Sequence, residues 1–447
     1  MRSYRFIISK LFILLIGSAN GQVEVSGAIG TSAFVSSKPE LTFWFYSNKE
    51  GIIDKNSDFL LYSSLGVDYY TYSGFSIEAK ANLAYNNSQD EIIPHELYLR
   101  LYNEFYELNF GRIRRRNFFN GISATNQNII WSNNALPLWG VSFNSLRTIY
   151  LTEKFGFEFE WSESFLDDPR WVKNSFVHHK VLSLVYGSIE DFQVKLGINH
   201  YAQWGGTSIS EGEQPASFED DYLRIVFALP GGRDSNETEQ HIALGNHIGS
   251  YVLQVSKHYN DFDLNFTYNS IFEDRKGSRL GNFPDGRYGF HLSFAEERAL
   301  VSDIHYDFLY TRNQSNHLNE AIASDYFNND TFRSGWTYYN RILGAPFFDY
   351  SAKANRVVGN KFLTHHIGIA GSFSNYFVSY PYKLLISHVH KEGRYFNYYE
   401  PDRNELYLNY EMGLLQRPFN LSIQLGTEFS NVAEPIFGAG VRLEKRF

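Results

Sequence analysis

The stretch Ile436-Phe437-Gly438-Ala439-Gly440-Val441-Arg442-Leu443-Glu444-Lys445-Arg446-Phe447 decides the fold. In an extended chain, successive side chains point to opposite faces. The apolar residues of this stretch then share one face, which only Lys445 interrupts: Phe437, Ala439, Val441, Leu443 and Phe447. The other face takes the small and charged residues: Gly438, Gly440, Arg442, Glu444 and Arg446. The alternation predicts a strand with one apolar side and one hydrated side.

The same alternation recurs along the chain. Four further examples have their apolar members at Leu421, Ile423, Leu425 and Phe429, at Phe262, Leu264, Phe266 and Tyr268, at Ile304, Tyr306, Phe308 and Tyr310, and at Phe155, Phe157, Phe159 and Trp161. In the last example the polar partners include Glu158 and Glu160. Paired carboxylates are costly inside a soluble sandwich, whereas a water-filled lumen accepts them. Many bacterial outer-membrane barrels also finish on an aromatic strand, so we predict a barrel of this class.

We predict about 18 wall strands, an even number such as single-chain bacterial barrels have. They cover approximately residues 41–47, 59–72, 75–86, 95–103, 105–114, 141–151, 155–163, 179–187, 191–203, 247–259, 261–273, 287–294, 299–311, 361–374, 376–390, 404–414, 419–430 and 436–447. The predicted fold is all-β, a transmembrane antiparallel β-barrel whose long extracellular loops plug the lumen. The barrel domain takes residues 41–447, after a short periplasmic N-terminal segment at 22–40.

Residues 221–229 also resemble a strand, and the sidedness of the loops decides against it. Leaving this segment out of the wall puts every tight turn on the periplasmic side, together with both chain ends. Ser217 with Asp220 resembles a helix cap, and Tyr222, Ile225, Val226 and Leu229 repeat at helical spacing. We therefore predict a helix within one extracellular excursion at 204–246. The other predicted excursions are 115–140, 164–178, 273–286, 312–360 and 391–403.

Composition and charge exclude several classes of protein. Aromatic residues make up 17% of the 447 residues, which favours strands and water–lipid interfaces. The mean hydropathy of −0.34 and the lack of any run of ~18 apolar residues exclude a helical membrane protein. The chain has no cysteine, which excludes a disulfide scaffold, a thiolate metal site and a cysteine nucleophile. With 49 acidic against 40 basic residues, nucleic acid is not an expected partner.

The first 21 residues have the features of a secretory signal peptide. Arg2, Arg5 and Lys10 form a basic start, residues 11–16 an apolar core, and Ala19-Asn20-Gly21 a small-residue cleavage site. Removing three basic residues changes the formal net charge from −9 to −12. Together with the strand pattern, export predicts the outer membrane of a Gram-negative bacterium, with its lipid and lipopolysaccharide as surroundings.

Four segments resemble the capsule-assembly (Wzi-like) outer-membrane family. They are Asn109-Phe110-Gly111-Arg112, Trp131-Ser132-Asn133-Asn134-Ala135-Leu136-Pro137-Leu138, Leu244-Gly245-Asn246-His247-Ile248-Gly249-Ser250-Tyr251, and Gly335-Trp336-Thr337-Tyr338-Tyr339 with Gly344-Ala345-Pro346-Phe347. The resemblance implies an 18-stranded barrel with a loop-filled lumen that binds capsular or exopolysaccharide and anchors it at the cell surface. It implies a lectin-like role without a reaction or a cofactor. The best-known relatives begin with a periplasmic helical bundle, whereas only residues 22–40 precede the first predicted strand here. Contact with polysaccharide export machinery is therefore left open.

Aromatic and arginine side chains in the predicted loops are candidate contacts for a polysaccharide. Saccharides present apolar C–H faces and rings of hydroxyls, which suit aromatic platforms and planar polar groups. Five tryptophans fall in these loops: Trp131, Trp139, Trp171, Trp204 and Trp336. Arginines fork onto uronates and other acidic sugars, and here they cluster at Arg112, Arg114, Arg115 and Arg116. The predicted ligand-binding set is Trp131, Trp204, Trp336, Tyr338, Tyr339, Arg114, Arg115 and Arg116. The structural alternative is that the rings pack a loop cap or an interfacial girdle, and that the arginines pair with Glu158 or Glu160.

Catalytic and metal sites are weakly indicated. Asp303, His305 and Asp307 share a strand face, as alternate residues of any strand do, and fit a hydrated lumen. His178-His179 and His365-His366 point to opposite faces if extended, and no Ser–His or carboxylate set has a motif-like context. We expect no enzyme, no metal and no cofactor. Two functions stay open, a plugged polysaccharide anchor and a carbohydrate porin or diffusion channel. The excursions at 204–246 and 312–360 are long enough to fill an 18-strand pore, which favours the anchor.

Overall fold

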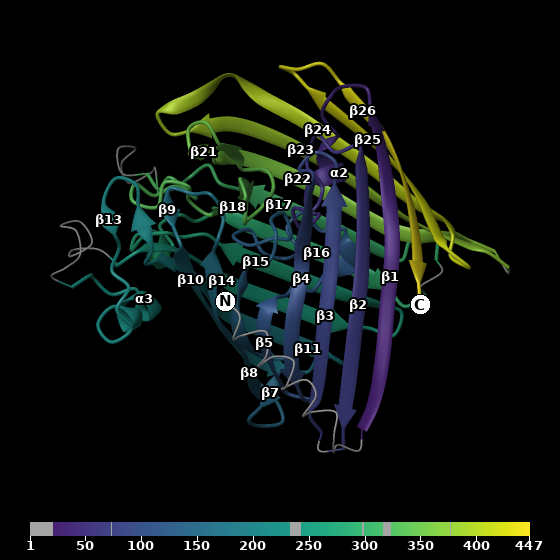
Figure 1. Cartoon of the computed structure of the whole chain (residues 1–447), viewed down its shortest axis with the longest axis horizontal. Helices are drawn as coiled ribbons and strands as arrows, with labels where there is room; N and C mark the ends of the chain where they lie inside the picture. The colour runs from purple at the N-terminus through teal and green to yellow at the C-terminus, as the bar shows by residue number, and fades with distance from the viewer. Residues whose placement is uncertain (1–20, 73, 233–242, 297–298, 316–322, 376) are drawn as a thin grey trace, which may run out of the picture.

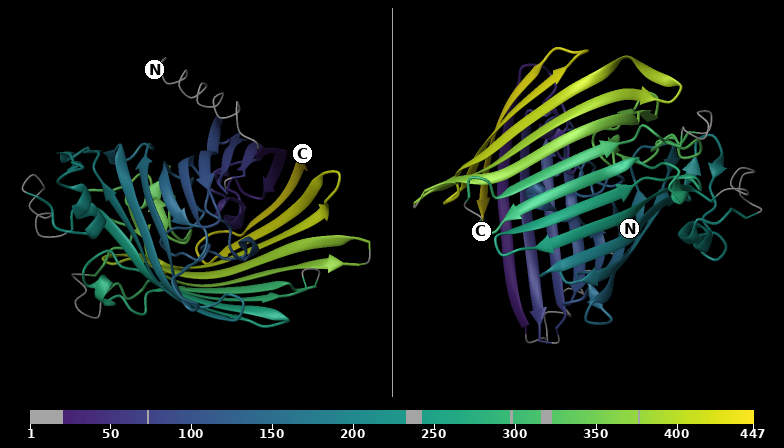
Figure 2. Two further views of the ribbon diagram at one scale, coloured as in Figure 1. Left: turned by 90° about the horizontal axis from the view of Figure 1, so that it is seen from below. Right: turned by 180° about the vertical axis from the view of Figure 1, so that it is seen from behind.

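A computed structural model describes residues 21–447 except 73, 233–242, 297–298, 316–322 and 376. The predicted signal peptide therefore lies, apart from Gly21, outside the described residues. Eighteen antiparallel strands form the wall of a closed barrel, which confirms the predicted fold class and strand number (Figures 1 and 2). Among the described residues, no helix has the length and apolar character needed to cross a membrane.

The wall strands pair with their neighbours in chain order, and β1 closes the ring by pairing with both β2 and β26. They are β1 (Gly21–Ser36), β2 (Phe59–Thr71), β3 (Ser76–Asn86), β4 (Glu91–Tyr102), β5 (Tyr106–Arg112), β6 (Trp139–Ser145) continued by β7 (Ile149–Tyr150), β8 (Phe155–Leu166), β10 (Ser175–Gly187), β11 (Phe192–Trp204), β14 (Asn246–His258), β15 (Phe262–Ser270), β16 (Gly286–Phe294), β17 (Asp303–Tyr310), β22 (Lys361–Ser374), β23 (Ser379–Arg394), β24 (Asn397–Leu415), β25 (Asn420–Ser430) and β26 (Ile436–Arg446).

The remaining elements are short and lie in the connections. They are α2 (Phe43–Tyr46), η1 (Phe119–Gly121), β9 (Val172–Lys173), β12 (Thr207–Ser208), β13 (Gly212–Glu213), α3 (Tyr222–Phe227), η2 (Gly277–Arg279), β18 (Thr337–Tyr338), β19 (Arg341–Ile342), β20 (Asp349–Ser351) and β21 (Arg356–Gly359). α3 confirms the helix predicted at 221–229. The connections at 103–105 and 259–261 are tight and lie at the same barrel end as the start of β1 and the end of β26, as predicted. The prediction that every tight turn lies at that end is wrong, because the short turns at 87–90 and 395–396 lie at the opposite end.

The first wall strand is not the one that the sequence predicted. Residues 22–40 were predicted as a periplasmic segment and 41–47 as a strand, but β1 occupies most of the former and α2 lies within the latter. From Ser26 to Ser32 the lumen face of β1 carries only small residues, among them Ala28 and Gly30, so the alternation has little contrast there. In α2, three consecutive aromatic side chains are all buried, which no strand between lipid and water provides. The excursion predicted at 391–403 is also wrong, because β23 and β24 continue as a hairpin to Arg394 and Asn397.

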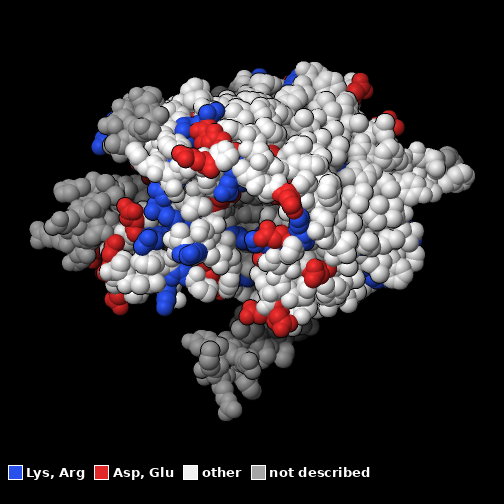
Figure 3. Space-filling view, turned by 90° about the horizontal axis from the view of Figure 1, so that it is seen from above, with Lys and Arg blue, Asp and Glu red and all other residues white. Residues whose placement is uncertain are grey.

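The two faces of the wall follow the predicted alternation. Large apolar side chains are exposed on the outer face, for example Val25, Leu184, Leu196, Leu425 and Val441. Charged residues instead gather around a hollow in the face that Figure 3 shows, while the visible flank carries few of them. An outward apolar belt around a polar interior is the pattern of a membrane-spanning barrel.

Two long connections and α2 fold into the barrel and form a plug, defined here as residues 43–46, 113–138 and 323–348. Its core side chains, among them Ile129, Ile130, Phe327, Trp336 and Phe347, have no exposed surface. They form one apolar cluster with the wall residues Ile93, Leu166, Val177, Tyr201, Ile248, Leu309, Phe362, Val389 and Tyr407. The predicted plugging of the lumen by long loops is confirmed for the plug residues described within the excursions 115–140 and 312–360.

The described part of the excursion at 204–246, residues 204–232 and 243–246, does not fill the lumen. Its helix α3 packs against the outer face of the wall, where Tyr222, Ile225 and Leu244 cover Ala202 and Trp204 of β11. Figure 1 shows α3 beside the strands and not between them. Loop length indicates that a connection has room to fold back, but it does not indicate on which side of the wall it does so.

Candidate functional site

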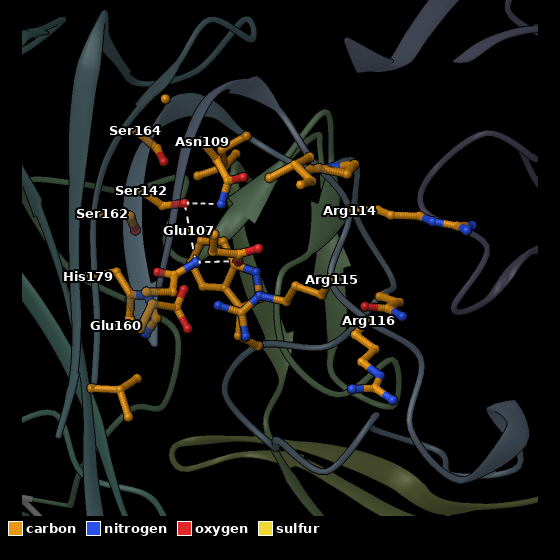
Figure 4. Close-up of a pocket in the computed structure, with 18 of the residues that line it drawn as sticks. Glu107, Asn109, Arg114, Arg115, Arg116, Ser142, Glu160, Ser162, Ser164 and His179 are labelled. Carbon is orange, nitrogen blue, oxygen red and sulfur yellow. Dashed lines mark hydrogen bonds and ion pairs between the residues drawn. The ribbon is translucent and has the colours of Figure 1, made fainter. Parts of the chain in front are cut away.

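A cavity of about 550 Å³ lies inside the barrel between the plug and β5, β6, β8, β10 and β11. Its polar lining comes from alternate lumen-facing positions of these strands, such as Asn109, Ser142, Ser162 and Ser164 (Figure 4). Towards the barrel end that carries the chain termini, the lining reaches Leu146 and Arg147 beside a short turn. A cavity of this size is within the range of ordinary small-molecule sites.

A column of three parallel rings forms part of the wall of this cavity. Tyr201 of β11 stacks on His179 of β10 with ring centroids 3.9 Å apart, and on Trp131 of the plug at 4.4 Å. The interplanar angles are 6° and 10°. Tyr201 and His179 are buried within the column, whereas Trp131 at its end is partly exposed and is a suitable platform for the apolar C–H face of a sugar ring.

Arg115 joins this column to the polar side of the cavity. Its Nη2 donates a hydrogen bond of 2.5 Å to the Tyr201 hydroxyl, and its guanidinium lies 5.3 Å from the Trp131 ring centroid. Figure 4 shows the Arg115 side chain directed towards Glu160 and His179, with Arg114 pointing away. Within the described part of the chain, Arg115 makes no ion pair with a carboxylate. Its remaining N–H donors suit a carboxylate or hydroxyl ligand.

The structural alternative, in which the arginines pair with Glu158 or Glu160, is wrong. Glu160 pairs with His179 at 3.1 Å and Glu158 with Lys195 at 2.5 Å. Arg114 instead reaches Glu50 at 3.8 Å and Glu96 at 3.6 Å. Arg116 is exposed, and no ion pair of its guanidinium occurs among the described residues.

The other predicted ligand residues lie away from this cavity. Trp336 and Tyr338 are fully buried in the plug core, so they present no surface to a ligand. Tyr338 accepts a hydrogen bond of 2.7 Å from Arg112, while Tyr339 is exposed. Trp204 was predicted in a loop but ends β11, where it packs between Phe176 and Tyr222 outside the lumen. Of the predicted set, four residues therefore line the first cavity together: Trp131, Arg114, Arg115 and Arg116.

Trp139 and Trp171 have structural contacts of their own. Trp139 begins β6, and the Arg112 guanidinium lies 4.8 Å from its ring centroid. Trp171, which lies in the connection after β8 as predicted, has the Arg333 guanidinium 4.8 Å from its ring centroid. Trp171 and Tyr339 are thus the aromatic candidates left on the side of the long loops.

Sequence reasoning missed Tyr201, His179 and Glu50 as site residues. Tyr201 and His179 lie within wall strands, whereas the predicted ligand residues were chosen from the loops. Their lumen-facing parity was nevertheless available, because Tyr201 alternates with outward residues of β11. Glu50 follows α2, which the sequence interpreted as a strand.

A second cavity of about 620 Å³ lies on the opposite side of the plug, against β1 to β3 and β23 to β26. Both cavities are lined by Glu50, Arg114, Asn126 and Asn133, so these residues separate one cavity from the other. Burial raises the pKa of Glu50 to about 7, although the nearby Arg114 charge opposes the shift. Glu50 therefore changes charge near neutral pH.

We expect Glu50→Gln to reduce the pH dependence of stability. Between pH 4.5 and about 7, Glu50 is protonated in the folded state but ionised in the unfolded state. The free energy of unfolding therefore falls as pH rises through this window. The variant should be more stable than the parent above pH 7, by on the order of 1–3 kcal/mol. The measurement is the midpoint of heat modifiability on gels from pH 4 to 9. Glu434→Gln, at an exposed surface carboxylate, is the matched control. Parallel pH profiles for parent and Glu50→Gln would contradict the assignment.

The lumen-facing carboxylates and histidines of β16 and β17 hold the plug. Asp307 accepts hydrogen bonds from Ser123 Oγ and the Ala124 backbone N–H, and Asp303 accepts one from Asn120. Phe119 stacks on His291 and His305. Among the described residues, no group of three or more His, Asp or Glu is placed to hold a metal ion.

Comparisons with known proteins show which solved structures share this fold. No family model matches the chain, and no curated protein matches its sequence. Among solved structures it is similar to Wzi of Escherichia coli, an outer-membrane protein involved in group 1 capsule assembly and a carbohydrate-binding β-barrel. That match has a TM-score of 0.58 at 11% identity, over 98% of this chain and 87% of that chain. OccAB4 of Acinetobacter baumannii matches with a TM-score of 0.49 at 11% identity, over 97% and 99% of the two chains. OprD of Pseudomonas aeruginosa matches at 0.47 and 9% identity, over 96% and 97%. The chain thus has the fold of an outer-membrane β-barrel.

Proposed function

We propose that the protein is a non-catalytic outer-membrane barrel that binds capsular or exopolysaccharide and holds it at the cell surface. The observation that carries this proposal is the plug, because its core is packed like a protein interior and is continuous with the wall. Trp336, Tyr338, Phe347 and Ile129 are all fully buried there. A lumen closed by such a core suits a protein that retains a polymer more than one that conducts solutes.

The chemistry of the first cavity supports a saccharide ligand. Trp131 supplies a partly exposed ring face, Arg115 supplies forked donors, and Asn109 and Ser142 supply neutral polar groups. This combination of aromatic platform and planar polar groups is what sugar rings require. The carbohydrate-binding barrel Wzi shares the fold, which is consistent with the proposal.

A single ring contributes modestly to binding affinity, so we expect Trp131→Ala to weaken polysaccharide binding without abolishing it. Stacking on one ring is worth ~0.5–1.5 kcal/mol beyond area burial, which corresponds to roughly 2- to 13-fold in affinity. The measurement is calorimetric binding of polysaccharide fragments prepared from the producing strain, with purified protein. Trp161→Ala, on the outer face of β8 and away from this cavity, is the matched control. Equal affinity of the parent and Trp131→Ala would remove this ring from the site.

Loss of the whole protein should have a larger effect, because contacts along a repeating polymer act together. A deletion strain should release polysaccharide into the medium while it still produces it. The measurement is the ratio of cell-associated to released polysaccharide. An unchanged ratio in the deletion strain would contradict the anchor proposal.

The second candidate function is a carbohydrate porin or diffusion channel. One observation favours it: two polar cavities flank the plug and meet at Glu50 and Arg114. Steady conductance of the intact protein in planar bilayers would support this candidate, and its absence would support the anchor.

A further inference from the structure

The second cavity has more cationic than anionic groups. Its lining includes six cationic side chains, Lys49, Lys80, Arg114, Lys383, Arg442 and Arg446, and three carboxylates, Glu50, Glu411 and Glu444. The chain as a whole has the opposite sign, with a net charge of −9. This cavity therefore has an excess of positive charge in an acidic chain.

Two of these cations are distinguished by their lack of partners. Arg442 and Arg446 both pair with Glu444, and Lys80 lies 3.9 Å from Glu96. By contrast, the ammonium groups of Lys49 and Lys383 make no ion pair or hydrogen bond within the described part of the chain. The cost of partly burying an ammonium group is recovered when an anion is present.

Lys49 and Lys383 reach the cavity from opposite sides. Lys49 follows α2, whereas Lys383 projects from the lumen face of β23 towards the plug, with its Nζ 3.7 Å from the position that a Cβ on Gly121 would take. Burial lowers the pKa of Lys49; the charge of Glu411 opposes this shift, and those of Lys383 and Arg442 add to it. Glu411 lies directly across from Lys383 in the β23–β24 register, but within the described residues its carboxylate forms no ion pair with either ammonium group.

We propose that this cavity binds the carboxylate or phosphate groups of an acidic saccharide, with Lys49 and Lys383 as the main anion contacts. The inference rests on the proposed polysaccharide-binding function and gives its ligand a chemical class. Asn48, Asn82 and Gln424 line the same cavity and offer neutral donors and acceptors to the sugar hydroxyls. A volume of about 620 Å³ accommodates a short oligosaccharide segment.

The test is calorimetric binding with the purified full chain in detergent. The probes are a tetramer of galacturonic acid, the neutral maltotetraose and inorganic phosphate. The acidic tetramer should bind at least 10-fold more tightly than the neutral one, with an affinity that falls as salt rises. The double variant Lys49→Gln/Lys383→Gln should lose at least 10-fold, whereas Lys353→Gln at an exposed loop position should not change binding.

Three results would overturn the proposal: equal affinity for the two tetramers, unchanged affinity of the double variant, or phosphate binding as tightly as the acidic tetramer. The last would identify a simple anion site. If the double variant does not fold, lysine acetylation of the parent keeps the test decisive, because the acidic tetramer should protect Lys49 and Lys383. Lack of protection would overturn the site. A deletion strain that loses surface polysaccharide would leave the proposed function standing in any of these cases.

An independent observation concerns α3 on the outer face of the barrel. On β10 the lumen side carries Val177 and His179, so His178 and Lys180 face outward. α3 covers these polar groups: Tyr222 donates a hydrogen bond of 2.7 Å to Glu163, which also pairs with His178, and Lys180 donates to the Val226 carbonyl. Uncovered, they would face lipid at a high free-energy cost.

The opposite side of α3 is apolar and exposed. Leu223 and Phe227 of α3 are 58% and 65% exposed, and Phe218, four residues before the helix, is 74% exposed. The same wall strands carry the outward-facing Leu182, Leu184 and Leu196 nearer the chain termini, so the two apolar surfaces adjoin. We infer that this side of α3 rests in the acyl-chain layer of the outer leaflet, where an amphipathic helix is stable.

The absence of cysteine from the chain makes a spin-label test direct. Leu223→Cys and Phe227→Cys would be labelled in proteoliposomes, with Leu184→Cys as the lipid reference and Ser210→Cys as the water reference. We expect both α3 labels to collide with oxygen more than with a water-soluble nickel complex, as at Leu184. Nickel-dominated collisions would overturn the inference, and so would dipolar broadening between labels, which would indicate a second copy of the chain.

Discussion

Replacing residues 326–347 by a short Gly/Ser linker is expected to turn a closed barrel into an open channel. This segment supplies Phe327, Trp336, Tyr338 and Phe347 to the plug core, and it is hydrogen-bonded to the other plug loop through Ser132 and Asn134. An 18-stranded wall is wide enough to enclose an aqueous channel once its interior is empty. The ladder of wall hydrogen bonds does not include this segment, so the barrel should still fold.

The measurement is single-channel conductance in planar bilayers, with heat modifiability on gels as the check on folding. The intact protein should show no steady conductance, and the linker variant should show stable, ohmic steps. Replacing residues 209–212 by the same linker is the control, because this turn joins β12 and β13, which belong to neither the wall nor the plug. Ohmic steps of the intact protein would favour the channel function, and a silent linker variant would mean that another segment closes the lumen.

The wall was predictable because lipid and water impose opposite demands on alternate residues. Glu158 and Glu160 were expected in the lumen and line the first cavity. His179 and His366 face inward while their neighbours His178 and His365 face outward, as their parity required. β1 was missed because its lumen side chains from Ser26 to Ser32 are small and contrast little with the outer face. The strand predicted at 41–47 was wrong because the aromatic residues of α2 are buried on every side.

The site was only partly predictable, because its contacts join distant parts of the chain. Trp131 and Arg115 were named from the sequence, but their partner Tyr201 is about 70 to 90 residues away and belongs to a wall strand. Tyr338 was predicted as a binding residue, but its hydroxyl accepts a hydrogen bond from Arg112, 226 residues earlier in the chain. Composition indicates that a residue suits a sugar, whereas only tertiary structure indicates whether its ring is accessible.

Asp307→Ala is expected to loosen the plug and to destabilise the barrel strongly. Both Asp307 and Arg287 are fully buried and lie 2.6 Å apart, so the substitution leaves the guanidinium without its countercharge. Removing one partner of a buried pair typically costs about 3–5 kcal/mol. Ser123 and Ala124 also lose their acceptor, which releases residues 113–138 from the wall. Heat modifiability should move to lower temperature, and trypsin should cut faster after the exposed Arg116.

The double variant Arg287→Met/Asp307→Leu separates these two effects. Replacing a buried pair by apolar residues of similar size is often neutral for stability, so the heat-modifiability midpoint should return towards the parent. Cleavage after Arg116 should stay fast, because neither new side chain accepts the hydrogen bonds of Ser123 and Ala124. If the double variant restored both readouts, the pair would matter only for its charge. If Asp307→Ala changed neither, the plug would be held by its apolar core alone. The expected split assigns Asp307 two separable roles, as the countercharge of Arg287 and as the acceptor that fixes the plug against β17.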